Sequence, residues 1–439
     1  MQTGGKLARN IGLGALILYG IGDMVGAGIY GTIGKIAGEM GNAVWIAFVI
    51  AMVAALLTGL SYASLASRYP RAAGAAYVAR RAYGRPFVAY LVGMAVTASG
   101  LTSMATASHA FTDALRPAIG AFPGWGVILL FLAGLALLNF VGIRQSIWAN
   151  AICTLVEVGG LLFVIATGAR YWGSVDYLTS AHPEIALPPA MLLSGAVLAF
   201  FAFIGFEDML NVAEEVKDPE RTMPRAMIAA LVAVAILYML IAVTAVSVVP
   251  FQQLGNAQLG APFVQITART APWLPGWVFQ TITLFAVANT ALINFIMASR
   301  LAYGLARQGL LPAPIAVVHP RRQTPHLAIL AVAAIVVVLA LSADLTQLAG
   351  ATSLLLLTSF CVVNTALIVL KRRSDEPPGR FEVPVIIPAL GAIVCAGLIA
   401  ARIPSGGKAP LIALAILAVI AVLYAVLRPR NPAPMPEES

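Results

Sequence analysis

The chain has 439 residues, 60% of them hydrophobic and 10% charged, and its mean hydropathy is +0.90. A typical soluble domain carries about 25% charged residues, so this composition excludes a soluble globular protein and indicates one that crosses a lipid bilayer repeatedly. The net charge of +9 does not indicate a nucleic-acid partner, because the basic residues lie between the apolar segments.

The apolar segments number about twelve, and each is long enough to span a membrane as a helix. In chain order the predicted spans are 11–37, 42–66, 86–112, 124–143, 146–170, 190–214, 225–249, 276–305, 326–342, 345–370, 383–402 and 409–428. The stretch 371–384, between the tenth and eleventh spans, is rich in charge and proline, and we interpret it as a solvated loop.

The basic residues predict the orientation. Placing the N-terminus in the cytoplasm leaves six of the 27 outside, namely Lys35, Arg116, Arg170, Arg269, Arg402 and Lys408. The other 21 then lie on the cytoplasmic side, which is the bias that membrane proteins show. We therefore expect a multi-pass protein of the cell (plasma or inner) membrane with both termini in the cytoplasm.

The first span contains the stretch "YGIGDMVGAGIYG" (19–31), with five glycines and Asp23. Each glycine destabilises a helix interior by roughly 1 kcal/mol relative to alanine, and an ionised carboxylate at the bilayer centre costs at least ~2.5 kcal/mol. These residues predict a helix that breaks at its middle. The break would free backbone N–H and C=O groups, which lipid cannot satisfy but a zwitterionic ligand can.

The sixth span has a similar interruption, "FFAFIGFEDMLNVAEEVKDPERTMP" (200–224), with Gly205, Glu207 and Asp208 at its middle. The two interruptions lie five spans apart. A group of five spans that starts at the sixth therefore crosses the membrane in the opposite orientation to the group that starts at the first. This pattern indicates an inverted repeat with a binding site between two discontinuous helices. A fourth carboxyl group within an apolar segment is that of Glu157 in the fifth span.

Several motifs resemble those of the amino acid–polyamine–organocation (APC) superfamily, close to its amino acid permeases. They are "IGDMVGAGIYGTIGKIAG", "YASLASRYPRAAGAAYVARRAYGR", "NFVGIRQS", "FFAFIGFEDMLNVAEEVKDPERTMPRA" and "ASRLAYGLARQGLLP". The resemblance implies an all-α integral membrane protein with about twelve transmembrane helices in a LeuT-like 5+5 inverted repeat, discontinuous at spans 1 and 6. It divides the chain into an N-terminus (1–10), two repeats (11–170 and 190–370), two extra spans (383–428) and a tail (429–439).

The resemblance also implies a substrate site. The backbone of Gly26, Ala27 and Gly28 would bind the α-carboxylate of an amino acid. Its α-amino group would bind the carbonyls of Met24, Phe201 and Ile204. Small Ala202 suggests an apolar pocket for a neutral amino acid, whereas the surplus acid suggests a cationic amino acid or polyamine; we favour neutral or broad specificity.

The resemblance places Glu207 at an acid implicated in coupling. Glu157 stands where many relatives have a lysine that replaces a sodium ion, and Asp208 stands where many have a neutral residue. A buried carboxyl group can gain and lose a proton as the cavity opens first to one side of the membrane and then to the other. We therefore expect proton coupling through Glu207 or Glu157, with Asp23 and Asp208 as further candidates, and we favour the proton over sodium.

Alternative functions remain open at this point. An amino acid exchanger or a non-transporting sensor fits the same motifs. "GIGD" (20–23) and "PAL" (388–390) also fit an intramembrane aspartyl protease, but the "YD" motif of its partner aspartate is missing, so we do not expect an enzyme. We expect no cofactor or metal, and no disulfide-linked partner subunit, because Cys153, Cys361 and Cys395 all lie in apolar spans.

Overall fold

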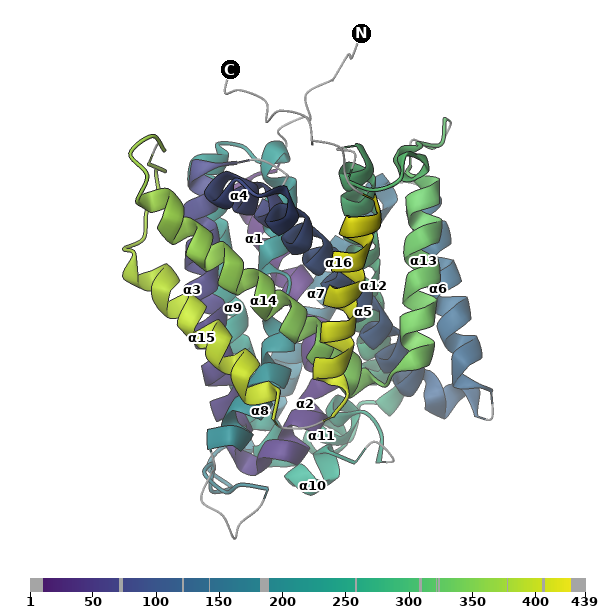
Figure 1. Cartoon of the computed structure of the whole chain (residues 1–439). Coiled ribbons are helices and arrows are strands. Elements are labelled where there is room, and N and C mark those ends of the chain that lie inside the picture. Colours follow the sequence, from purple (N-terminus) through teal and green to yellow (C-terminus); the bar gives the residue numbers. More distant parts are fainter. Residues whose placement is uncertain are drawn as a thin grey trace.

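The computed structural model describes residues 11–427, apart from 71–73, 121, 142, 182–188, 257–258, 308–309, 321, 323, 377 and 405–406. The described residues form helices and no strands. The long helices run between the two ends of one bundle, with α4 at one end and α10 and α11 at the other (Figure 1).

The α-helices are α1 (Leu13–Met24), α2 (Ala27–Met40), α3 (Val44–Arg68), α4 (Gly74–Tyr83), α5 (Pro86–Ile119), α6 (Gly124–Val141), α7 (Ile143–Gly168), α8 (Pro189–Phe200), α9 (Pro219–Val248), α10 (Phe251–Leu254), α11 (Pro262–Thr270), α12 (Gly276–Arg307), α13 (His326–Ser342), α14 (Leu345–Lys371), α15 (Ile386–Arg402) and α16 (Ala409–Leu427). Shorter 3-10 segments are η1 (Gly41–Ala43), η2 (Ala169–Tyr171), η3 (Phe201–Phe203), η4 (Phe206–Glu215) and η6 (Ala313–Ala316).

Several of these helices suit a membrane. Within the described ranges, nine helices are long and apolar enough to cross a bilayer, and α1, α13 and α15 are shorter apolar helices. This confirms the prediction of a helical protein with many membrane-spanning segments. The sequence did not predict the short helices α4, α10 and α11, which lie between the predicted spans.

The outermost helices are apolar on their exposed faces. Leu130 of α6, Val338 of α13 and Val426 of α16 each expose more than half of their surface. In a membrane protein such side chains face lipid, which is as apolar as the protein interior. The inner helices pack closely instead, with α5 against α12 and α3 against α9, and they surround both interruptions.

The connection between α14 and α15 is largely exposed, as the sequence suggested, but two of its carboxyl groups dock onto other helices. Glu376 accepts hydrogen bonds from Arg81 Nε at 2.8 Å and from the Tyr69 hydroxyl at 2.6 Å. Glu382 accepts one from Arg68 Nε at 2.5 Å. The prediction missed this docking because it depends on partners about 300 residues away in the sequence. The loop therefore ties α14 and α15 to the end of α3 and to α4.

Candidate functional site

The first predicted break is present. Helix α1 ends at Met24, Val25 is extended, and α2 begins at Ala27. A Cβ atom on Gly26 would lie 1.9 Å from Thr290 Oγ1, so the close approach of α12 requires glycine there. The Ala27 N–H donates a hydrogen bond of 2.9 Å to the same oxygen. The break is thus held against α12.

The second predicted break is also present. Helix α8 ends at Phe200, η3 forms a single tight turn, and Ile204 is extended. Gly205 has φ +128°, a conformation that side chains with a Cβ rarely adopt. The chain then continues as a 3-10 segment, η4, instead of an α-helix. The helical hydrogen-bonding pattern is therefore interrupted over 201–205.

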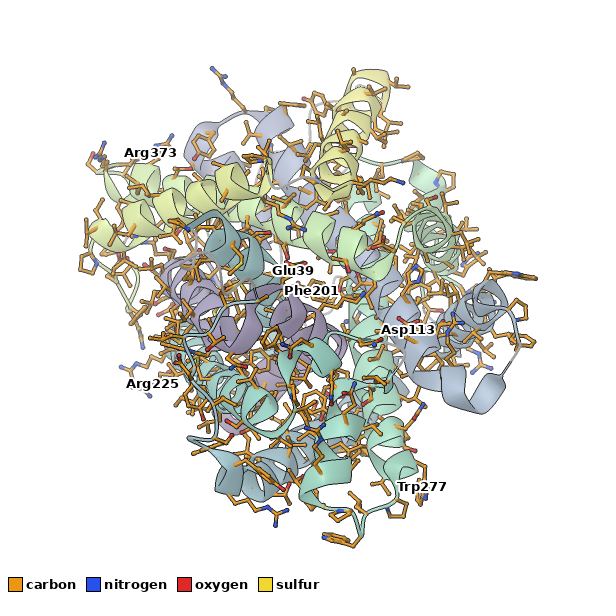
Figure 2. The ribbon with its side chains drawn as sticks, turned by 90° about the horizontal axis from the view of Figure 1, so that it is seen from below. Glu39, Asp113, Phe201, Arg225, Trp277 and Arg373 are labelled. Atoms are coloured by element: carbon orange, nitrogen blue, oxygen red, sulfur yellow. The ribbon has the colours of Figure 1, made fainter. Side chains whose placement is uncertain are left out.

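The two breaks touch each other backbone to backbone. A Cβ atom on Gly28 would lie 2.5 Å from Ala202 Cα, and one on Gly205 would lie 2.8 Å from the carbonyl carbon of Asp23. Seen from below, Phe201 lies in the middle of the bundle (Figure 2). Two interruptions separated by about 180 residues in the sequence thus meet at the centre of the molecule.

A small pocket, with room for little more than a water molecule in this conformation, lies between the breaks. It is lined by Asp23, Met24, Gly28, Ser103, Phe201, Ile204, Gly205, Asp208, Thr290 and Asn294. Six predicted site residues are in that lining: Asp23, Met24, Gly28, Phe201, Ile204 and Asp208. Glu207 lines an adjoining hollow that shares Ile204, Asp208 and Asn294.

The other predicted substrate-binding residues lie around this pocket without lining it. Gly26 and Ala27 pack against Thr290, and Ala202 packs against Gly28. Some of the predicted backbone groups already have partners: the carbonyl of Met24 accepts a bond of 2.8 Å from the Tyr238 hydroxyl. A ligand would share that carbonyl through its second lone pair or displace the tyrosine.

Three carboxyl groups gather at the breaks. Glu207 Oε2 accepts a bond of 3.0 Å from the Gly205 N–H, at the N-terminal end of η4. Both carboxyl oxygens of Asp23 are buried and have no hydrogen-bond partner in the described part of the chain. Asp208 completes the group, and no lysine or arginine is among the residues that line the pocket. The two breaks thus bring three carboxyl groups together without a basic side chain in the pocket lining.

Glu157 lies elsewhere. It is fully buried on α7 and lines neither hollow. Its helix packs against α1, where a Cβ atom on Gly22 would lie 2.0 Å from Thr154 Oγ1. The structure thus brings Asp23, Glu207 and Asp208 together and leaves Glu157 in a separate cluster.

Sequence reasoning missed Ser103, Thr290 and Tyr238. Hydroxyl groups are common in apolar helices because they bond to their own backbone, as Thr290 Oγ1 also does with the Ala286 carbonyl at 3.3 Å. Their presence alone therefore carries little signal. Asn294 did carry a signal, as an amide in an apolar span.

Proteins of similar sequence include amino acid permeases and transporters. The family described as "Amino acid permease" matches residues 11–429. A branched-chain amino acid permease of Bacillus subtilis is 27% identical over 90% of this chain and 88% of its own length. A vacuolar cationic amino acid transporter of Arabidopsis thaliana is 30% identical over 83% of this chain, which spans 64% of that relative. An uncharacterized transporter of Mycobacterium tuberculosis is 30% identical over 89% of this chain and 85% of its own length. The chain belongs to the amino acid permease family.

Proposed function

We propose that this protein moves amino acids across the membrane by alternating access, binding them between its two broken helices. The observation that supports this most strongly is the backbone contact between the two breaks, beside a pocket at the centre of an apolar bundle. Secondary transporters built from inverted repeats bind substrate between discontinuous helices in this way. Membership of a permease family indicates a transporter and not an intramembrane protease.

The architecture we propose is a LeuT-like 5+5 inverted repeat. The first repeat would run from α1 to α7 and the second from α8 to α14, each starting with a broken helix. Helices α15 and α16 would be the two extra spans. Alternating access would then open the pocket to one side of the membrane at a time, with both termini in the cytoplasm.

The substrate would bind through its zwitterionic backbone. The N-terminal end of α2 would offer the positive end of a helix dipole and its first N–H groups to the α-carboxylate, although the Ala27 N–H already donates to Thr290. The carbonyls of Met24, Phe201 and Ile204 would accept bonds from the α-amino group. Asp23 and Asp208, which line the same pocket, would add negative charge near that group.

A cationic amino acid or polyamine is the second candidate substrate. The site has three carboxyl groups, which is more than a single ammonium group needs: those of Asp23, Glu207 and Asp208. The pocket lining offers no basic side chain to balance them. Phe201, which lines the pocket, favours a neutral side chain instead. Two of the relatives named above are a branched-chain amino acid permease and a cationic amino acid transporter. Both a neutral and a cationic substrate therefore belong in the test.

The test is uptake into liposomes that contain the purified protein, with labelled leucine, arginine or putrescine outside. Uptake is followed with and without an inward proton gradient, in the absence of sodium. We expect the gradient to drive accumulation of leucine or arginine, and an ionophore that collapses the gradient to abolish it. Binding of these compounds without uptake or exchange would contradict transport and support a sensor.

A further inference from the structure

A second cluster of polar side chains lies outside the substrate pocket, between α7 and α12. Asn150, Thr154 and Glu157 follow one another along α7 at helical spacing, and Asn289 faces them from α12. Thr154 Oγ1 donates to Asn150 Oδ1 at 3.0 Å, and Asn289 Nδ2 donates to the same oxygen at 3.3 Å. The amide groups thereby have a fixed orientation, which turns Asn289 Oδ1 away from Asn150.

This cluster contains more acceptors than donors. Both carboxyl oxygens of Glu157 and Asn289 Oδ1 are buried without a hydrogen-bond partner among the residues that the structure describes. Glu157 is 0% exposed and Asn289 is 1% exposed, and the two side chains interact. Buried acceptors are almost always paired, so these three oxygens need a donor. A proton on Glu157 would turn one of these oxygens into a donor.

In the described part of the chain, the Asn289 amide favours a negative charge on Glu157, but no basic side chain does. The titratable groups that interact with it are Tyr30 on α2, Cys153 on α7 and Tyr238 on α9. All three are neutral near pH 7 in their ordinary state, and no basic side chain is among the groups that act on Glu157. Three free oxygens are also fewer than the six or more that hard metal cations such as Ca²⁺ and Mg²⁺ take.

Glu207 is also buried, but its surroundings differ. Its carboxyl group accepts the Gly205 N–H and lies in the first turn of η4, where the helix dipole favours negative charge. The Gly205 N–H is thus a partner that neither carboxyl oxygen of Glu157 has.

We propose that Glu157 carries the coupling proton, at a site separate from the substrate pocket. This rests on the proposed transport function. In the outward-open state the Glu157 carboxylate takes a proton from hydronium, forming the neutral acid and leaving water. After the protein opens inward, the acid gives the proton to water on the cytoplasmic side and becomes a carboxylate again. The group is sealed from solvent between these states, as it is here.

Two contacts connect this site to the first helix break. The Tyr30 hydroxyl, on α2, donates to the backbone carbonyl of Glu157 at 2.7 Å. Gly22, on α1, packs against Thr154 one turn before Glu157. Helix α7 therefore touches both halves of the broken helix at the level of the proton site. Charging Glu157 would favour separation of these surfaces, because an unpaired carboxylate is unstable between them.

The test is the variant Glu157→Gln in liposomes, with labelled leucine and arginine as probes. Glutamine keeps the size of the side chain and supplies a permanent donor to Asn289. We expect accumulation driven by a proton gradient to fall at least ten-fold, while exchange against preloaded amino acid continues. Proton entry that accompanies uptake, followed with a pH-sensitive dye inside the liposomes, should disappear with it. Asp375→Asn, an exposed change in the loop after α14, is the control and should leave both activities unchanged.

The outcomes separate this inference from the proposed function. If E157Q still accumulates amino acid under a proton gradient, or if a sodium gradient drives the wild type instead, Glu157 is not the carrier although transport stands. If the wild type neither accumulates nor exchanges amino acid, the transport function itself is wrong. We expect Glu207→Gln to lower exchange and accumulation together.

A further measurement covers the case in which E157Q does not fold. The infrared spectrum of the wild type should contain the carbonyl band of a protonated carboxyl group at neutral pH, and Glu157→Asp should shift it. A wild-type spectrum without such a band would overturn the proposal.

Discussion

Gly28 lies against the backbone of Ala202, and these two segments of the chain approach so closely that only the hydrogen atom of a glycine fits between them. Gly205 has the same relation to Asp23. Composition alone does not distinguish these glycines from those that merely allow helices to pack. Their importance comes from their position, because each lies where one broken helix meets the other. A methyl group added at either glycine would therefore press on the backbone of the other break.

We therefore predict that Gly28→Ala impairs transport more than folding. Its Cβ atom would lie 2.5 Å from Ala202 Cα, so one break must move away from the other. We expect at least a ten-fold loss of amino acid uptake into liposomes, with the protein still monodisperse in detergent. The control is Gly14→Ala on α1, whose Cβ atom would meet nothing within 4 Å. That change should leave uptake intact and stabilise the helix by about 0.5–1 kcal/mol. Normal uptake by G28A would contradict the proposed role of this contact.

At the scale of elements, the two breaks could be predicted from the sequence because glycine and acid within an apolar run conflict with a continuous membrane helix. The same reasoning located Asp23 and Asp208 beside the pocket. It could not locate Thr290 or Tyr238, because their roles depend on which helices become neighbours. The docking of the loop after α14 was missed for the same reason: Glu376 is an ordinary loop residue until Arg81 lies beside it.

The ion pairs of this loop predict a response to acid. Burial raises the pKa of the Glu376 carboxyl group, but hydrogen bonds from Arg81 and Tyr69 outweigh burial and hold the pKa below its ordinary 4.5. The pair therefore contributes stability in full above about pH 4.5 and loses it as the pH falls through the lower folded-state value. Glu376→Gln should have the same effect at neutral pH, weakening the docking by about 1–3 kcal/mol.

Trypsin cleavage within the loop, in detergent at pH 7.5, measures this docking. We expect several-fold faster cleavage in E376Q than in the wild type. Asp375→Asn is the matched control, because Asp375 is an exposed neighbour in the same loop. Equal cleavage rates in E376Q and the wild type would show that the ion pair does not hold the loop.

At the scale of the whole molecule, the two ends differ. The loop that contains Glu382 contacts Arg68 at the end of α3, whereas the Tyr177 carbonyl accepts a bond from Trp45 at the start of the same helix. The two loops therefore lie at opposite ends of α3. The sequence could predict this alternation from the order of its spans. It could not predict which helices lie outermost, because α6, α13 and α16 are apolar whether they face lipid or protein.

These opposite loops provide a test of orientation. Basic residues gather in the loop after α14, so we expect it in the cytoplasm and the loop that contains Leu178 outside the cell. Ser374→Cys and Leu178→Cys place a thiol at exposed positions in these loops. A maleimide that cannot cross membranes should label L178C in intact cells, and label S374C only after the cells are opened. The wild type is the control, because its Cys153, Cys361 and Cys395 lie within apolar helices. Labelling in the reverse order would place both termini outside.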